Sequence, residues 1–361
     1  MIFARSRGRH NTNGASAASL LLATLALISL IANASAQTAP SVKPPQTPPA
    51  PTESPAGQPQ QRPRQTGQTS EPSSAIENDD EIVRVNSNLV VVPVSVTDAN
   101  GYPVSKLRAQ DFKLDEEGRT QEIAQVGDAD QVPLELAILL DVSGSVKARF
   151  AFEQEAAARF LKAVLRPADH AVVYAIDSTP HLVGTRASAD GAATTLMNIV
   201  LADGPTAFYD TVVDAARYLT RETPPQHRRV IVVISDGEDT FSASFKEAAS
   251  ALPEVQRADA VFYSINPTGP SLRLNRISVR GQDGMRQLAE ATGGTAFVPE
   301  ALESLDAEFR QIAAELRAQY LVQYYSNSEA PNGKYLHIKV QIPAQPALRI
   351  RARQGYYVHR S

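Results

Sequence analysis

The chain has 361 residues, of which 43% are hydrophobic and 20% are charged, proportions typical of a globular protein with about two or three domains. Its 35 basic and 39 acidic side chains give a net charge of -4, which argues against a nucleic-acid partner. The absence of cysteine excludes disulfides, thiolate metal sites and thiol nucleophiles.

Residues 1–36 have the pattern of an export signal. Three arginines provide a basic start, an apolar stretch follows at 20–31, and Ala34-Ser35-Ala36 forms a small-residue cleavage site. The alternative is an uncleaved anchor, but the apolar stretch is short for a bilayer. We therefore expect cleavage, export to the periplasm or the cell exterior, and no stable membrane insertion afterwards. Loss of the three arginines would take the net charge from -4 to -7.

Residues 37–80 are expected to form a disordered linker. Residues 37–75 hold 10 of the chain's 25 prolines, together with many Gln, Ser and Thr residues. This composition cannot build a core and favours an extended, solvated backbone. The linker would act as a spacer between the folded part and its surroundings.

Residues 82–130 are expected to form a small β segment. A strongly β-branched run at 89–97 is followed by the turn-forming sequence Asp98-Ala99-Asn100-Gly101-Tyr102-Pro103 and by a second short apolar run at 112–114. This order predicts strand, turn and strand.

Between residues 133 and 317, predicted strands alternate with predicted helices. Such alternation favours parallel strands joined by crossover helices, that is, an α/β fold with a doubly wound, mostly parallel sheet. Ligands bind such sheets at the carboxyl ends of the strands. The predicted strands are 134–140, 171–176, 230–235, 260–265 and 295–298, and the predicted helices are 146–165, 206–219, 244–255, 284–291 and 302–317.

Residues 318–361 are expected to form a C-terminal β extension packed on or beside the sheet. Strand patterns occur at 319–325, 335–342 and 348–353. The tail is rich in tyrosine, and the alternation of its aromatic positions favours cross-strand packing over a ligand platform.

Three separated segments place oxygen-bearing side chains after a predicted strand or at the start of a predicted helix. Because the carboxyl ends of parallel strands meet at one edge of a sheet, these segments can converge. Hydroxyl and carboxylate oxygens are the ligands that Mg²⁺ prefers, in near-octahedral geometry at about 2.1 Å. The predicted metal-site residues are Asp141, Ser143, Ser145, Thr206 and Asp236.

The charge of this site indicates the kind of partner. Only Asp141 and Asp236 would bring negative charge to the ion, so its charge would be incompletely neutralised. An acidic residue from a protein partner would then complete the coordination shell.

The pattern Asp-x-Ser-x-Ser, followed by Thr and Asp, resembles the metal-ion-dependent adhesion site of the von Willebrand factor type A family. The resemblance implies a Rossmann-like fold over residues 133–317, in which Ser143, Ser145 and Thr206 bind the ion most directly and the aspartates often act through water. With its flanks, the chain is similar to bacterial VWFA-related proteins. Gln354-Gly355-Tyr356-Tyr357-Val358 matches the tail of these proteins, and the resemblance leaves its role open.

Separate structural roles would explain the same residues one by one. Ser143 and Ser145 would cap the helix that begins near residue 146, Thr206 would cap the next helix, and Asp236 would close a turn. The joint occurrence of all five residues in compatible contexts favours the metal site.

Other features give weaker signals. Glu238 and Asp239 are interpreted as solvated loop charges. Residues 266–282 are long for a connection and carry three arginines, so they are interpreted either as a loop that selects the partner or as a disordered loop. The histidines show no metal-ligand spacing.

We therefore expect an exported, non-catalytic protein that mediates metal-dependent protein–protein interaction or adhesion. Mg²⁺ is the expected ion, with Mn²⁺ and Ca²⁺ as alternatives. One alternative function is that of a structural scaffold in an envelope assembly. A less favoured one is that of a metal-assisted hydrolase, which would require a general base that the sequence does not reveal.

Overall fold

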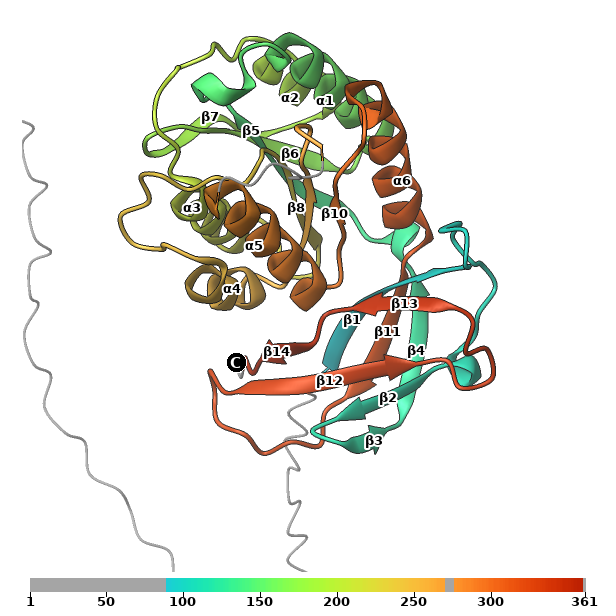
Figure 1. Cartoon of the computed structure of the whole chain (residues 1–361). Coiled ribbons are helices and arrows are strands. Elements are labelled where there is room, and N and C mark those ends of the chain that lie inside the picture. Colours follow the sequence, from blue (N-terminus) through green and yellow to red (C-terminus); the bar gives the residue numbers. More distant parts are fainter. Residues whose placement is uncertain (1–88, 270–275, 360–361) are drawn as a thin grey trace, which may run out of the picture. The chain divides into compact units, whose positions relative to one another are not determined.

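The computed structural model describes residues 89–269 and 276–359 (Figure 1). The predicted export signal, the predicted linker and Arg273 lie outside the described residues. Among the described helices, none is long and apolar enough to cross a membrane.

A six-stranded sheet forms the centre of the α/β part, with the strand order β10-β9-β8-β5-β6-β7. All its neighbouring strands are parallel except the antiparallel pair β6 and β7. Every residue of β5 is buried, as expected for a central strand covered on both faces. The strands are β5 (Leu134–Asp141), β6 (His170–Ile176), β7 (Pro180–Ala187), β8 (Arg228–Ile234), β9 (Ala260–Ile265) and β10 (Ala296–Phe297).

Three helices cover each face of this sheet (Figure 1). Because side chains alternate along a strand, Leu136 and Ile138 of β5 pack into one core, whereas Ala137 and Leu139 pack into the other. The predicted doubly wound, mostly parallel α/β sheet is therefore confirmed. One face carries α1 (Phe150–Val164), α2 (Ala189–Met197) and α6 (Leu305–Ala318), and the other carries α3 (Phe208–Glu222), α4 (Ala248–Arg257) and α5 (Arg276–Thr292).

Several boundaries differ from the sequence prediction. Residues 144–146 form a separate 3-10 turn, so α1 begins only at Phe150. Helix α5 begins at Arg276, so the prediction of a loop as far as residue 282 is wrong. β7 and α2 were not predicted: β7 lies at the sheet edge without a buried residue, and α2 is built mainly from alanine and threonine.

The β segments before and after the α/β part pair with each other. They form two four-stranded sheets, in the orders β13-β1-β11-β4 and β14-β12-β2-β3, which enclose a third core. Alternate valines of β1, Val90 to Val96, point into this core. The strands are β1 (Leu89–Thr97), β2 (Lys113–Glu116), β3 (Arg119–Gln121), β4 (Ile123–Asp128), β11 (Tyr320–Tyr325), β12 (Tyr335–Gln341), β13 (Arg349–Ala352) and β14 (Gly355–Tyr357).

Two consecutive arginines at the start of β8 contact the C-terminal ends of three helices. Arg228 donates to the carbonyl oxygen of Leu316 in the last turn of α6 at 2.8 Å. Arg229 donates to the hydroxyl of Thr223 at the end of α3 at 3.0 Å and to the carbonyl oxygen of Ala258 after α4 at 3.1 Å. Burial lowers the pKa of both guanidinium groups. Cations at helix C-termini interact favourably with the helix dipole, which offsets part of this cost.

We expect Arg229→Met to lower the free energy of unfolding by roughly 2–4 kcal/mol, because carbonyl oxygens at the ends of α3 and α4 would lose a charged donor. Urea unfolding measures the change. Arg221→Met, on α3 with a 58% exposed side chain, is the matched control and should change stability by less than about 0.5 kcal/mol. Equal losses in the two variants would contradict this role for Arg229.

Candidate metal centre

The predicted site residues follow adjacent strands of the parallel sheet. β5 pairs with β8, so Asp141, at the end of β5, and Asp236, two residues after β8, lie at the same edge. The loop before α3 docks on this edge, since the backbone N–H groups of Ala202 and Asp203 donate to the carbonyl oxygen of Val142 at 2.9 and 3.2 Å. Three segments far apart in sequence therefore meet here.

A chain of oxygen atoms joins three of the predicted residues. The hydroxyl oxygens of Ser143 and Ser145 are 3.0 Å apart, and the Ser145 hydroxyl donates to Oδ2 of Asp236 at 3.1 Å. Asp141 joins them because its Oδ1 accepts a bond from the backbone N–H of Ser143 at 2.9 Å. Four of the five predicted residues are thus directly linked.

Thr206, the fifth predicted residue, is buried in the docked loop. Its backbone N–H donates to the hydroxyl of Thr240 at 2.9 Å, and its carbonyl oxygen accepts from the N–H groups of Thr240 and Phe241. Within 89–269 and 276–359, no hydrogen bond joins the Thr206 side chain to the other four predicted side chains. The structure places Thr206 in the adjoining segment, and its backbone hydrogen bonds run to Thr240 and Phe241.

The proposed helix-capping roles are wrong. Ser143 precedes the 3-10 turn, but its hydroxyl makes no capping bond. Arg149 occupies the N-cap position of α1 and Ala207, rather than Thr206, that of α3, and neither side chain makes a capping hydrogen bond. Asp236 does close a turn, because its Oδ1 accepts from the N–H of Glu238 at 3.1 Å, while Oδ2 is the atom that Ser145 contacts.

Sequence reasoning missed Ser235, which connects the two aspartates. Its hydroxyl donates to Oδ2 of Asp141 at 2.6 Å and accepts from the N–H of Gly237 at 2.9 Å. Burial raises the pKa of the Asp141 carboxyl, and the bonds from Ser235 and Ser143 oppose that rise. The signal available in the sequence was the hydroxyl residue directly before Asp236.

Additional carboxylates lie around the site. A Cβ on Gly144 would clash with Oδ1 of Asp203, so a side chain there would displace Asp203. Glu238 and Asp239 are not simply solvated, which corrects the prediction. Glu238 accepts a bond from Ser278, and Asp239 accepts from the backbone N–H of Phe208 at 2.9 Å at the start of α3.

Comparison with known proteins identifies the family of this segment. Residues 136–238, which include all five predicted site residues, match the family model of the von Willebrand factor type A domain. The chain contains a von Willebrand factor type A domain. A comparison with curated proteins finds no match.

Several solved structures are similar to the chain. A von Willebrand factor type A protein from Catenulispora acidiphila is 18% identical with a TM-score of 0.42, over 65% of this chain and 51% of that one, so this chain spans about half its length. An aerotolerance-related membrane protein from Bacteroides fragilis NCTC 9343 is 21% identical with a TM-score of 0.38, over 51% of this chain and 98% of that one. BatB from Bacteroides thetaiotaomicron is 20% identical with a TM-score of 0.35, over 50% and 97%. Likenesses at these scores support no functional conclusion.

The candidate ligand set in the A domain combines hydroxyl and carboxylate oxygens. Across the described part of the chain, no group of three or more His, Cys, Asp or Glu side chains could hold a metal ion. A cation at this edge would depend on hydroxyl oxygens as well as on carboxylates. That requirement fits Ser143, Ser145 and Asp236, whose oxygens lie side by side.

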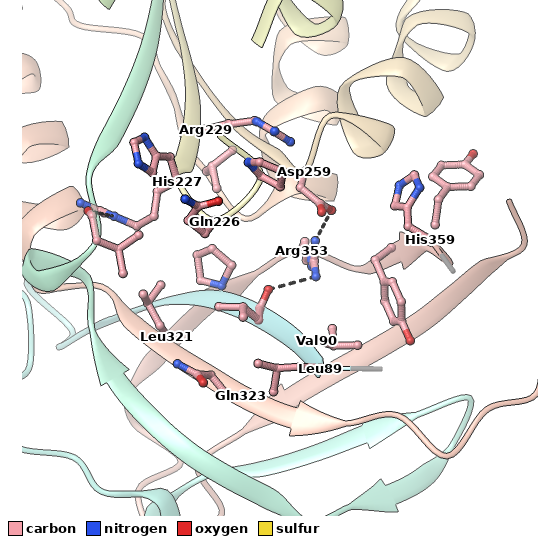
Figure 2. A pocket seen from close by; sticks show the side chains of 18 of the residues that line it. Leu89, Val90, Gln226, His227, Arg229, Asp259, Leu321, Gln323, Arg353 and His359 are labelled. Carbon is pink, nitrogen blue, oxygen red and sulfur yellow. Dashed lines mark hydrogen bonds and ion pairs between the residues drawn. The ribbon is translucent and has the colours of Figure 1, made fainter. Parts of the chain in front are cut away.

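A cavity of about 450 Å³ lies between the base of the A domain and the β strands, where β8 and β9 begin. Figure 2 shows Arg353 at its centre, paired with Asp259 and donating to the carbonyl oxygen of Val91 at 3.0 Å. His227, another lining residue, contacts the buried Glu135 at 2.8 Å. None of the five predicted site residues lines this cavity, so the strand-end site remains the stronger candidate.

Behind the candidate site, the first turn of α1 carries a buried ion pair. Arg149 Nε and Glu153 Oε1 are 2.7 Å apart, and the Glu153 side chain is fully buried. Burial raises the pKa of Glu153 to about 7, Arg149 opposes the rise, and the charges of Asp141 and Asp236 add to it. The negative charge of the A-domain site therefore raises the pKa of a carboxyl group in α1.

This shift predicts a pH-dependent stability. Between about pH 4.5 and 7 the folded chain keeps a proton on Glu153 that the unfolded chain has released, so this stabilisation is complete below pH 4.5 and is lost as the pH rises through 7. We expect Glu153→Gln to reduce the fall in unfolding free energy between about pH 5 and 8 by roughly 3 kcal/mol. Urea unfolding of chelator-treated protein measures it.

Glu155→Gln is the matched control, because Glu155 lies on the same helix with a 59% exposed side chain. It should leave the pH profile of the unfolding free energy unchanged. If both variants keep the profile of the original chain, the assignment of this titration to Glu153 is wrong.

Proposed function

We propose that the chain is a non-catalytic binding module that captures a protein partner through a divalent cation. Asp141, Ser143, Ser145, Thr206 and Asp236 would hold the ion, with Mg²⁺ preferred. The bound ion would supply an electrostatic anchor for a carboxylate of the partner. The predicted export signal and linker extend the proposal to capture in the periplasm or outside the cell.

The spacing of the oxygen atoms is the observation that carries this proposal. Neighbouring ligands of an octahedral ion at about 2.1 Å lie about 3.0 Å apart. The Ser143–Ser145 and Ser145–Asp236 oxygen distances are 3.0 and 3.1 Å. These side-chain hydrogen-bond distances are compatible with neighbouring ligands of Mg²⁺, and they support the proposal that the oxygens share one ion.

The remaining residues would support these ligands. Both carboxylate oxygens of Asp141 are bonded, one to the backbone of Ser143 and one to Ser235, so Asp141 orients the site and adds negative charge. Groups that orient ligands in this way affect metal affinity about 10–100-fold. Two carboxylates, Asp141 and Asp236, are too few for a complete shell, which leaves room for a carboxylate from outside.

The hydrolase alternative requires a general base within reach of a bound substrate. Glu153 has the raised pKa that such a base would need, but its side chain is fully buried and paired with Arg149. The scaffold alternative differs in its consequence, since the ion would then raise stability without selecting a partner. The exposed Ser145 favours a site open to a partner.

Calorimetric titration of chelator-stripped protein tests the metal site. We expect Ser143→Ala and Asp236→Ala to weaken Mg²⁺ binding at least about tenfold, because each removes an oxygen from the linked set. Ser188→Ala, before α2, is a matched control that should bind like the original chain. Unchanged affinity in both site variants, with the circular dichroism spectrum preserved, would refute the proposal.

The choice of ion gives a second test. Mg²⁺ usually keeps several waters beside one or two carboxylates, whereas Ca²⁺ takes six to eight oxygen ligands, so this small ligand set should bind Mg²⁺ and Mn²⁺ more tightly than Ca²⁺. Ser235→Ala should relax this preference, because Asp141 loses the hydrogen bond that fixes it and Mg²⁺ demands the stricter geometry. Competition titrations of the original chain and of this variant measure the ratio. Tighter binding of Ca²⁺ by the original chain would contradict the proposed preference for the smaller ion.

A further inference from the structure

The tail motif whose role the sequence leaves open lines the large cavity at the base of the A domain. Tyr356, Tyr357 and Val358 of this motif contribute to the cavity wall. Arg353, which directly precedes the motif, lies at the centre of the cavity (Figure 2). The volume of about 450 Å³ is within the range of small-molecule sites, which combine apolar walls with a few polar groups. The cavity therefore has the size of a ligand site.

One wall of the cavity is an apolar sheet face. Because side chains alternate along β1, Leu89 and Val91 point away from the core that the other valines of this strand fill, and both line the cavity. Leu89 is 45% exposed and Val91 is 38% exposed. Pro93 and its cross-strand neighbour Leu321 of β11 continue this face. Such a wall would bury the apolar body of a ligand.

The charged groups of the cavity are mainly basic. The lining contains three arginines, Arg228, Arg229 and Arg353, and one aspartate, Asp259, which leaves a surplus of two positive charges when the histidines are neutral. Arg228 and Arg229 donate to carbonyl, hydroxyl and amide oxygens, which carry no negative charge. Positive charge beside apolar walls attracts an anion more strongly than it would in open water.

Arg353 is the group best placed to contact an anion. One of its Nη atoms is paired with Asp259, and the other donates to the carbonyl oxygen of Val91 at 3.0 Å (Figure 2). An arginine carries five N–H donors, and across the described residues Nε of Arg353 has no hydrogen-bond partner. We propose that the cavity binds a small organic anion, with a carboxylate, sulfonate or phosphate group at Arg353 and an apolar body against Leu89 and Val91.

Asp259 is the competitor that such a ligand would meet. Its side chain is 45% exposed and shares the guanidinium of Arg353 with the cavity. A bound anion would therefore be repelled by Asp259 while it is attracted by Arg353. Asp259 has a φ of 52°, a left-handed conformation that asparagine also adopts readily, so Asp259→Asn removes the charge without straining the backbone.

Calorimetric titration of the full chain in the presence of chelator tests the site. The probes are decanoate and naphthalene-2-sulfonate, which are anions on apolar bodies, and decyltrimethylammonium, a cation with the same ten-carbon chain as decanoate. We expect both anions to bind at one site and the cation to bind at least about tenfold more weakly. The chelator prevents a carboxylate from binding through an ion at the metal centre.

Two charge variants should act in opposite directions. We expect Arg353→Gln to weaken decanoate binding about tenfold, because a charge-assisted hydrogen bond is lost, and Asp259→Asn to strengthen it about threefold, because the repulsion is removed. Val91→Ser should weaken binding through the apolar wall. Leu182→Ser is its matched control, because Leu182 is also 38% exposed but lies on β7, outside the cavity lining, and it should bind like the original chain.

Three results would overturn the inference: no saturable binding of either anion, equally tight binding of the cation, or equal decanoate affinity of the two charge variants. If Arg353→Gln loses its native circular dichroism spectrum, Asp259→Asn decides the matter, and an affinity no higher than that of the original chain would count against an anion site. Because these titrations contain no free Mg²⁺, none of their outcomes affects the proposed metal-dependent function.

Discussion

The buried carboxylate of Asp141 is the group on which the arrangement of the site depends. It has no exposed surface at the end of the central strand β5, and a buried charge is costly unless hydrogen bonds compensate it. Ser143 and Ser235 provide these bonds from two different segments. Ser145 follows the first of these segments and Asp236 follows the second. The hydrogen bonds to Asp141 therefore also position the Ser145 hydroxyl and the Asp236 carboxylate. The geometry of the candidate ligand set is thus a consequence of burying one carboxylate.

The parallel topology gives the two edges of the sheet opposite electrical character. Crossover helices begin at the edge where the strands end, so helix N-termini face the candidate site and helix C-termini face the opposite edge. At the first edge, Asp239 accepts from the backbone at the start of α3. At the other, Arg228 and Arg229 donate to carbonyl oxygens at helix ends. The guanidinium groups near the large cavity are therefore engaged by helix ends, and the carboxylates near the site are compatible with the positive ends of the helices.

The sequence predicted the α/β part well because its central strands are short apolar runs and its helices are amphipathic, patterns that report burial directly. The same reasoning failed for β7, whose edge position leaves it without a buried residue, and for the long connection before α5. The metal-site residues could be proposed because their types and order carry chemistry. Ser235 was missed because its role depends on the pairing of β5 with β8, which brings residues 94 positions apart within 2.6 Å. The pairing of the two terminal β segments was equally hidden, since strand partners depend on long-range register.

A buried ion pair joins the β part of the chain to the last helix of the A domain. Helix α6 ends at Ala318 and β11 begins at Tyr320, so the last helix continues almost directly into a central strand of the β part. Glu315 of α6 is 1% exposed, and its Oε1 lies 2.6 Å from Arg351 of β13. A buried carboxylate that loses its cation is strongly destabilising. A chain cut after α6 would therefore lose the cation that pairs with Glu315. It would also lose the strands that pair with β1, so α6 and the β part stabilise each other.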